Sequence, residues 1–216
     1  MSTTAKAPTL AQAIASAQAA ADAIVAKVPG TPRVVVTLVR SNSDGRRIRP
    51  HYGYTTVQKV WKVAETGERY LEVALAAEHL NRKAEEVFGT LLHELAHAYN
   101  LANGIKDTDT NGRHNRRFAE TAETLFGLTI EQAPGIGWSV TTCPDDTVKR
   151  FAGAFTHTVK ATRFQADTPA EGKAKGRDRN LPVATCGCGN KVRAARTVIE
   201  NGITCKACGE DFEYRS

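Results

Sequence analysis

Two histidines and a glutamate lie close together in the sequence, with a spacing that suits a metal site. His93, Glu94 and His97 form the pattern H-E-x-x-H within the apolar segment 87–104. On a helix, residues four positions apart lie on one face, so both imidazoles can reach one metal ion. The glutamate can accept a proton from water on that ion, because Zn²⁺ lowers the pKa of bound water to about 7. The pattern predicts metal-assisted hydrolysis of a peptide bond, and the alternative is chance spacing on a core helix.

The residues around this motif predict a buried helix whose polar side chains need partners. Asn81 suits the N-cap, and Asn103 followed by Gly104 suits the C-terminal end. Between these ends the segment is apolar on nearly every side, which is typical of a buried helix. Unpaired polar groups are costly there, and a metal ion would pair with both histidines and the glutamate. Gly89 weakens the helix, and we interpret it as a close crossing with another element.

A catalytic zinc ion usually has three protein ligands and one open position, so a third ligand is expected downstream. His114 is the best candidate. It precedes a segment whose apolar residues share one helical face: Phe118, Ala122, Leu125 and Phe126. The start of a helix disfavours a protonated imidazole and so favours the neutral form that binds metals.

Other interpretations compete with this assignment. A helix-capping or surface position would also explain His114. Glu120 and Glu123 are rival ligands, because a glutamate from a downstream helix serves in some zinc peptidases. The other histidines lack comparable spacing and are interpreted as ordinary polar residues: His51, His79 and His157.

Four cysteines near the C-terminus form a second group with metal-ligand spacing. They make one C-x-C pair and one C-x-x-C pair, each followed by glycine: Cys186, Cys188, Cys205 and Cys208. Four thiolates in two close pairs predict a tetrahedral structural zinc site. Disulfides are the alternative, but they need an oxidising compartment, and the chain shows no secretory signal. Cys143 is left over and is expected to be a free thiol.

Positive charge is concentrated in the C-terminal third of the chain. The formal net charge is +6, with 16 Lys/Arg and 16 Asp/Glu in residues 1–148 but 13 and 7 in residues 149–216. A basic tail with a zinc ribbon suits an acidic partner such as DNA or RNA. Aromatic residues are sparse there, which favours contacts to phosphates over readout of bases. The alternative is a solvated linker that is basic for solubility. The candidate contacts are Lys173, Lys175, Arg177 and Arg179 in the linker and Lys191, Arg193 and Arg196 in the ribbon.

The remaining patterns predict the elements that position these groups. Residues 9–28 have helical spacing of apolar residues, and residues 33–40 read as a strand. Two further strand-like runs, 56–63 and 69–74, flank a hairpin turn, and residues 138–142 add another strand. We expect an antiparallel sheet beside the metal-binding helix, with an edge strand that can align an extended substrate. Residues 1–8 are expected to be disordered, and residues 165–180 are expected to form a polar linker.

The motifs resemble those of the SprT-like metalloproteases, which include the Spartan proteases. The resemblance rests on HELAH, on the downstream HNRRF and on CGCG…CKACGEDF, although Asn115 stands where many members have glycine. It implies that Glu94 is the general base and that His93, His97 and His114 bind zinc. It also implies a C-terminal zinc ribbon. Spartan-type members degrade proteins crosslinked to DNA, and many bacterial relatives have no assigned substrate.

We therefore expect an α+β protein with a zincin-like peptidase core, in which an antiparallel sheet packs on the H-E-x-x-H helix, followed by a small zinc ribbon. The expected parts are a peptidase domain at 9–148, a basic polar linker at 149–180 and a four-cysteine ribbon at 181–216. No apolar run approaches the length of a transmembrane helix, so no membrane partner is expected.

The expected activity is that of a zinc metalloendopeptidase with one catalytic and one structural Zn²⁺. It would act on protein substrates, in association with DNA or RNA, in a bacterial cytosol or a phage-infected host cell. One alternative is a nucleic-acid-binding or regulatory protein whose peptidase fold is not used for proteolysis. Another is a peptidase that cleaves phage-type regulators.

Overall fold

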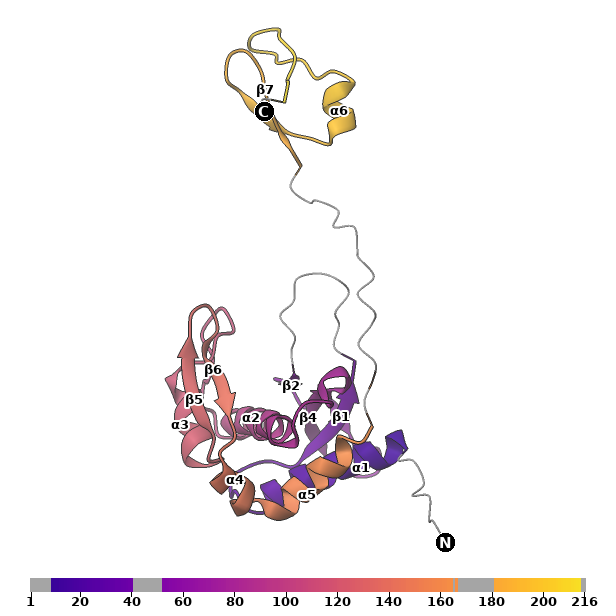
Figure 1. The fold of residues 1–216 in the computed structure, drawn as a ribbon, viewed down its shortest axis with the longest axis vertical. Coiled ribbons are helices and arrows are strands. Elements are labelled where there is room, and N and C mark those ends of the chain that lie inside the picture. Colours follow the sequence, from indigo (N-terminus) through magenta and orange to yellow (C-terminus); the bar gives the residue numbers. More distant parts are fainter. Residues whose placement is uncertain (1–8, 41–51, 165, 167–180, 215–216) are drawn as a thin grey trace. The chain divides into compact units, whose positions relative to one another are not determined.

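The chain of 216 residues forms two compact units, residues 1–168 and 169–216, in a computed structural model (Figure 1). The structure describes residues 9–40, 52–164, 166 and 181–214. The disorder predicted for residues 1–8 and almost all of the linker predicted at 165–180 therefore lie outside the described residues, as does His51. The elements of the first unit position the histidine motif, and those of the second position the four cysteines.

The first unit begins with the predicted alanine-rich helix, α1 (Leu10–Val25). Thr9 caps it through a reciprocal pair of hydrogen bonds with Gln12, which satisfies two free amides of the first turn. The buried face of α1 consists mainly of alanines, which allow the late helix α5 (Ala152–Ala161) to pack closely against it. The helix predicted at 9–28 is thus confirmed, and it ends slightly earlier than expected.

The central sheet is mixed rather than antiparallel. It contains β1 (Val34–Val39), β2 (Gly53–Thr55), β3 (Trp61–Lys62) and β4 (Arg69–Ala76). β1 pairs with β4 in parallel, whereas β2 and β3 pair with β4 in antiparallel fashion. β4 lies between β1 and β2 in the sheet. It runs in the same direction as β1 and in the opposite direction to β2. The prediction of a purely antiparallel sheet is therefore wrong for β1 and β4. The alternation of apolar residues identifies a strand but does not show which strand pairs with it or in which direction.

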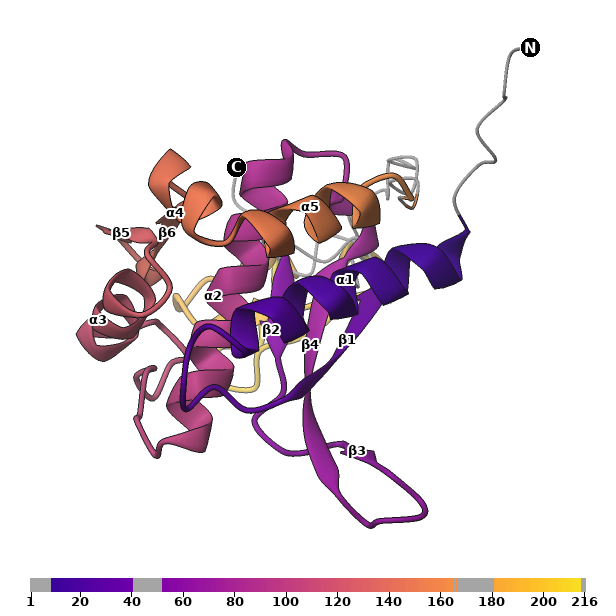
Figure 2. The ribbon, with the colours of Figure 1, turned by 90° about the horizontal axis from the view of Figure 1, so that it is seen from below.

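Helices α1 and α2 (Ala84–Ala102) cover one face of this sheet (Figure 2). Leu71, Val73 and Leu75 point from β4 into the core, which they share with residues of these two helices. The β3–β4 hairpin projects from the body, and its turn contains Gly67 at φ +73°, as the predicted turn requires. This layering places α2 directly against β2 at the edge of the sheet.

Helix α2, which carries the histidine motif, and several shorter elements complete the first unit. α2 begins after Lys83 rather than after the predicted cap Asn81, and it ends at Asn103 and Gly104 as expected. The predicted strand near 138–142 is present, and an unpredicted strand pairs with it. The remaining elements are η1 (Ala77–His79), α3 (Arg116–Thr124), β5 (Thr129–Ala133), β6 (Gly137–Thr142) and α4 (Asp145–Arg150).

The first unit extends beyond the domain end predicted at residue 148. Phe151, Ala154 and Ala161 are buried against the core, so α5 and the residue before it belong to the unit rather than to the linker. The linker assigned from residue 149 therefore begins too early. Small residues form most of the buried face of α5, so its helical pattern is weak in the sequence.

The second unit contains β7 (Val183–Thr185), β8 (Lys191–Arg193) and the short helix α6 (Arg196–Glu200). Its core is very small, with Ala184, Ile199 and two of the cysteines as its buried apolar residues. A core of this size rarely folds without a cross-link or a metal ion. In the part of the chain that the structure describes, no helix is both long and apolar enough to cross a bilayer.

Candidate metal centre and its cleft

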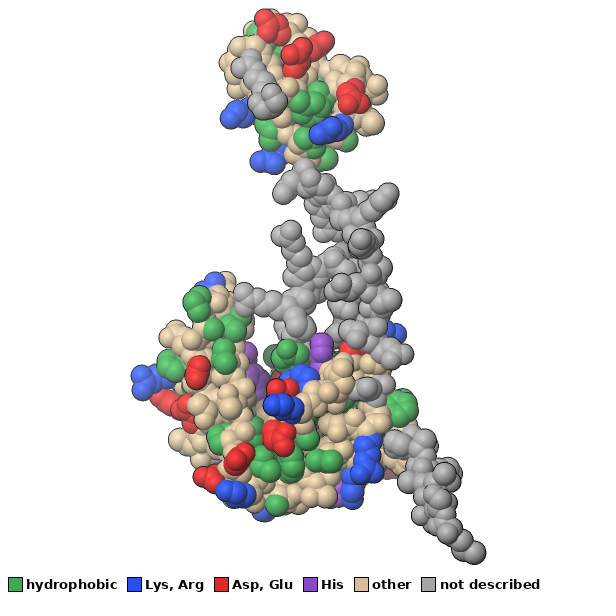
Figure 3. All heavy atoms as spheres, in the orientation of Figure 1, with side chains coloured by type: hydrophobic (Ala, Val, Ile, Leu, Met, Phe, Trp, Pro, Cys, Tyr) green, Lys and Arg blue, Asp and Glu red, His purple; other side chains and the backbone are tan. Residues whose placement is uncertain are grey.

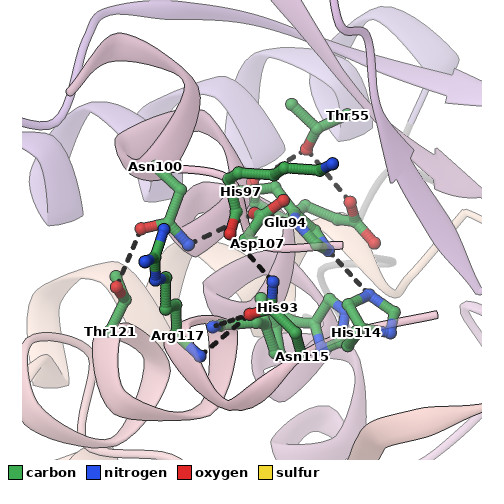
Figure 4. Close-up of polar contacts among 12 residues, drawn as sticks. Thr55, His93, Glu94, His97, Asn100, Asp107, His114, Asn115, Arg117 and Thr121 are labelled. Carbon is green, nitrogen blue, oxygen red and sulfur yellow. Dashed lines mark hydrogen bonds and ion pairs between the residues drawn. The ribbon is translucent and has the colours of Figure 1, made fainter. Parts of the chain in front are cut away.

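Three imidazoles converge on one point between α2 and the start of α3 (Figure 4). His93 and His97 project from one face of α2, and His114 lies two residues before α3. The His114 Nε2 atom lies 2.8 Å from Nε2 of His97 and 3.3 Å from Nε2 of His93. All three candidate ligand atoms lie within 4.8 Å of one another. The structure thus brings together the three histidines that the sequence analysis selected.

The outer ring nitrogens of these histidines are all occupied. His97 Nδ1 donates to Asp107 Oδ2 at 2.6 Å, and His93 Nδ1 lies 2.8 Å from Thr141 Oγ1. His114 Nδ1 contacts the hydroxyl of Ser139. Sequence analysis missed these three partners, because Asp107 comes from a loop and Ser139 and Thr141 come from a hairpin, and the motif predicts the position of neither.

The hydrogen bonds of these partners determine the tautomer of each ring. The Asp107 carboxylate can only accept, so His97 carries its proton on Nδ1. The Ser139 hydroxyl donates to Ile136 O at 3.0 Å, and the Thr141 hydroxyl donates to Ser139 O at 3.3 Å. Both hydroxyls therefore accept from the histidines, and all three Nδ1 atoms are donors.

With Nδ1 protonated, each Nε2 atom carries a lone pair, and that of His114 lies 2.8 Å and 3.3 Å from those of His97 and His93. Such an arrangement is repulsive unless a cation lies among the nitrogens. Burial and then repulsion between the rings lower the pKa of His93 well below its usual value, and they lower the pKa of His114 to about 4. His93 and His114 are therefore neutral at pH 7, which is the form that binds metals. These residues fit a divalent metal ion.

An aromatic ring lies against all three histidines. The Phe118 centroid is 4.5 Å from those of His93 and His97 and 4.6 Å from that of His114. Phe118 is fully buried on the first turn of α3. The sequence analysis assigned it only to an apolar helix face. The contacts limit the rotation of the imidazoles.

A chain of buried polar groups supports His97. Asp107 Oδ2 also accepts from Asn100 Nδ2 at 3.2 Å, and Asn100 Oδ1 accepts from Thr121 Oγ1 at 2.8 Å (Figure 4). Burial raises the pKa of Asp107, but the hydrogen bonds from His97 and Asn100 outweigh it and leave that pKa below its usual value. The carboxylate thus stays charged and orients the His97 ring. A polar Asn100 on an otherwise apolar helix was the sequence signal for this chain.

Two neighbours fix the backbone of His114. Asn115 is the N-cap of α3, and its side chain accepts from the amides of Arg117 at 2.9 Å and Phe118 at 3.3 Å. Its φ of −97° needs no glycine, so asparagine at this position is compatible with the turn. From the β5–β6 hairpin, Trp138 N donates to His114 O at 3.0 Å. A Cβ atom on Gly137 would lie only 2.2 Å from that oxygen, so the close approach requires glycine.

Glu94 lies beside the histidine cluster and outside its ligand set. It is only 6% exposed, and its Oε2 lies 3.0 Å from the Thr55 hydroxyl on β2. The same hydroxyl lies 2.8 Å from the Glu94 backbone oxygen. Burial raises the pKa of Glu94, while the neighbouring His97 and the Thr55 hydrogen bond act in the opposite direction. The carboxyl group is thus held in place and is more basic than an exposed one.

The rival ligands are engaged elsewhere. Glu120 pairs with Arg116 at 3.3 Å on the exposed face of α3. The Glu123 carboxylate accepts from Ile130 N at 3.3 Å. His79 packs edge-on against Tyr52, with their ring centroids 4.9 Å apart. Neither glutamate belongs to the described groups that could hold a metal ion.

The cluster opens into a cleft of ≈1220 Å³ between β2 and the β5–β6 hairpin, and Figure 3 shows histidine side chains in this hollow. β2 is an edge strand. Ala76 N donates to Tyr52 O at 2.9 Å, and Thr56 N donates to Glu72 O at 3.0 Å. Because backbone groups of alternate residues point to opposite sides of such a strand, Gly53 and Thr55 direct theirs away from β4. Among the described residues no strand pairs with this side of β2, so the cleft offers an open strand edge next to Glu94.

The four cysteines of the second unit also converge. Cys188 Sγ lies 3.3 Å from Cys186 Sγ and 3.8 Å from Cys205 Sγ, which exceeds the length of a disulfide bond. The four Sγ atoms lie within 4.8 Å of one another, and all are free. Asn190 Nδ2 donates to Cys188 Sγ at 3.4 Å and to Cys205 Sγ at 3.5 Å. This group could hold a metal ion of the kind that thiolates bind.

The remaining cysteine, Cys143, is a free thiol as expected. It packs on Gly89, where an added Cβ would lie 3.3 Å from the Cys143 Cβ. Gly89 therefore marks the predicted close crossing, between α2 and the residue after β6. Burial and two nearby carboxylates raise the pKa of Cys143 to about 11, so the thiol is protonated at neutral pH.

The predicted nucleic-acid contacts of the second unit are exposed. Lys191 and Arg193 flank Val192 on β8, and the Arg196 guanidinium lies 5.7 Å from the Tyr214 ring centroid. Residues 181–214 nevertheless contain four basic and four acidic residues, so all of the positive excess lies elsewhere in 149–216. The linker lysines and arginines at 173–179 lie outside the described residues.

Comparison with models of protein families, with curated proteins and with solved structures finds no match to this chain.

Proposed function

We propose that this protein is a zinc-dependent metalloendopeptidase. The observation that carries the proposal is the convergence of three histidine ring nitrogens, with the Glu94 carboxyl group beside them in an open cleft. Three histidine ligands leave a fourth position free on a tetrahedral zinc ion, which is typical of catalytic sites. The intact H-E-x-x-H motif and the resemblance to SprT-like proteases agree with this proposal.

The residues around the cluster divide the work of hydrolysis. A zinc ion held by His93, His97 and His114 would acidify a water molecule and polarise the substrate carbonyl. Glu94 accepts the proton of the attacking water and returns it to the leaving amine. Thr55 holds the Glu94 carboxylate, and Asp107 holds the His97 ring, so both groups keep their orientation during the reaction.

The open edge of β2 supports an extended peptide as the substrate. Gly53 and Thr55 offer backbone donors and acceptors to an added strand, and Thr55 at the same time contacts Glu94. A bound strand would therefore pass the general base at a fixed distance. Folded substrates would have to expose an extended segment before cleavage.

The four cysteines support a structural zinc site in the second unit. The small core of that unit needs such a cross-link, and Asn190 already donates to two of the thiols. The exposed Lys191, Arg193 and Arg196 support association with nucleic acid through phosphates. Glutamine at all three positions should weaken DNA binding and flatten its salt dependence by up to about three units. An unchanged salt dependence would rule out these contacts.

Glu94→Gln tests the proposed activity. Glutamine keeps the shape of the side chain but cannot accept a proton from water at neutral pH. We expect zinc content to be unchanged and cleavage of a labelled unfolded protein to fall at least about 100-fold. Glu86→Gln is the matched control, because Glu86 lies on the same helix and lines the same cleft. Equal activity of wild type and Glu94→Gln would favour a binding protein with an unused peptidase fold.

A further inference from the structure

Arg82 occupies one end of the cleft and is fixed in position. Its Nε atom donates to His79 O at 3.0 Å, and its Nη2 atom donates to Thr90 Oγ1 at 2.9 Å. The guanidinium carbon lies 3.9 Å from the centroid of the Tyr52 ring, which itself packs on His79. Three groups thus immobilise a side chain that is normally flexible.

The charge of Arg82 has no carboxylate partner within the described residues. The guanidinium has five N–H groups, and the two hydrogen bonds above use two of them. Burial lowers the pKa of Arg82, which shows that water solvates the charge incompletely, but the group stays protonated at neutral pH. Glu85 and Glu86 line the cleft, and Glu86 attracts the guanidinium from a distance without forming an ion pair with it. A fixed and half-buried cation with free donors is suited to an anionic ligand.

The distance from Arg82 to the proposed reaction centre follows from α2. Its partner Thr90 lies four residues before Glu94, which corresponds to about 6 Å along the helix axis. An extended chain advances about 3.3 Å per residue, so this distance spans about two residues. Tyr52 directly precedes β2, so Arg82 lies at the beginning of the open strand edge.

We propose that Arg82, stacked on Tyr52, binds a carboxylate side chain of the substrate one or two residues to the C-terminal side of the cleaved bond. This inference rests on the proposed peptidase function. The side follows from an antiparallel arrangement of the substrate on β2, which is the commoner pairing of strands. The substrate would then place its C-terminal part beside Tyr52 and its N-terminal part toward Val57.

The test uses zinc-loaded full-length protein and peptides that differ only in one residue. A single Glu is moved along the peptide, with Gln at the same position in the matched peptide, and mass spectrometry locates each cleaved bond. We expect kcat/KM to be about 10- to 100-fold higher for Glu than for Gln at the predicted position, as for a hydrogen-bonded charge pair. Arg82→Gln should abolish this ratio, and Arg82→Lys should restore part of it. Lys106→Gln, which removes another positive charge from the cleft, should leave the ratio unchanged.

A binding measurement separates this inference from the proposed activity. Zinc-loaded Glu94→Gln protein should bind the Glu peptide more tightly than the Gln peptide by the same factor, and adding Arg82→Gln should remove the difference. If wild type cleaves no peptide but the binding ratio depends on Arg82, the peptidase proposal fails and the carboxylate site stands. If Arg82→Gln leaves both ratios unchanged, or Glu is preferred on the N-terminal side, the inference is wrong.

Discussion

Gly137→Ala is a sharp test of how the third histidine is held. Gly137 has φ +74°, and a Cβ atom there would lie 2.2 Å from His114 O and 3.2 Å from His114 C. Carbon and oxygen atoms in contact need more than 3 Å, so the hairpin or the His114 backbone has to move by about 1 Å. A metal–nitrogen distance can deviate from its usual value by only about 0.2 Å. The substitution should therefore remove His114 from the ligand set and lower zinc affinity at the histidine site at least about 100-fold.

Gly112→Ala is the matched control. Gly112 also has φ +74°, but nothing lies within 4 Å of its added Cβ. Both substitutions impose the cost of a left-handed alanine, about 1–2 kcal/mol of folding stability, and only Gly137→Ala also displaces His114. Competition with a chromophoric chelator measures the zinc affinity, with the cysteine site as an internal reference. Equal zinc affinities in the two variants would refute the assigned role of Gly137.

Two further predictions concern the groups around the histidines. Asp107→Asn should lower zinc affinity about 10- to 100-fold, because asparagine orients the His97 ring less strongly, whereas Asp109→Asn in the same loop should not; equal losses in both variants would contradict the role of Asp107. The metal-free first unit should lose stability as the pH falls from 7 toward about 4, which is the pKa of His114 in the folded state. In this range the unfolded chain binds protons at His93 and His114, whereas the folded chain does not, so acid favours unfolding. Tryptophan fluorescence reports this unfolding, since both tryptophans lie in the first unit, and stability that rises on acidification would contradict it.

Local spacing determined how much of the site could be predicted. His93, Glu94 and His97 lie on one helix, so their common face follows from helical geometry alone. His114 could be predicted because it precedes a recognisable helix. Asp107, Ser139 and Thr141 could not, because their positions depend on the path of a loop and on the register of a hairpin. Neither leaves a periodic signal in the sequence.

The same limit explains the errors in the fold. The strand at 34–39 and the hairpin around Gly67 follow from alternation and from turn residues. The parallel pairing of β1 with β4 depends on how the strands are arranged in the sheet, and the alternation of apolar residues does not determine this arrangement. Helix α5 was assigned to the linker because alanine and threonine form most of its buried face. The buried face of α1 also consists mainly of small residues, and the sequence does not show that the two helices pack together.

Zinc content per chain tests the central claim most directly. Elemental analysis should find two zinc ions in the wild-type protein, one in His97→Ala and one in Cys205→Ser, because the two groups of ligands lie in separate units. The zinc that remains in His97→Ala should resist chelators longer than the zinc that remains in Cys205→Ser. A wild-type protein with a single zinc ion that His97→Ala retains would contradict the histidine metal centre and the peptidase function proposed for it.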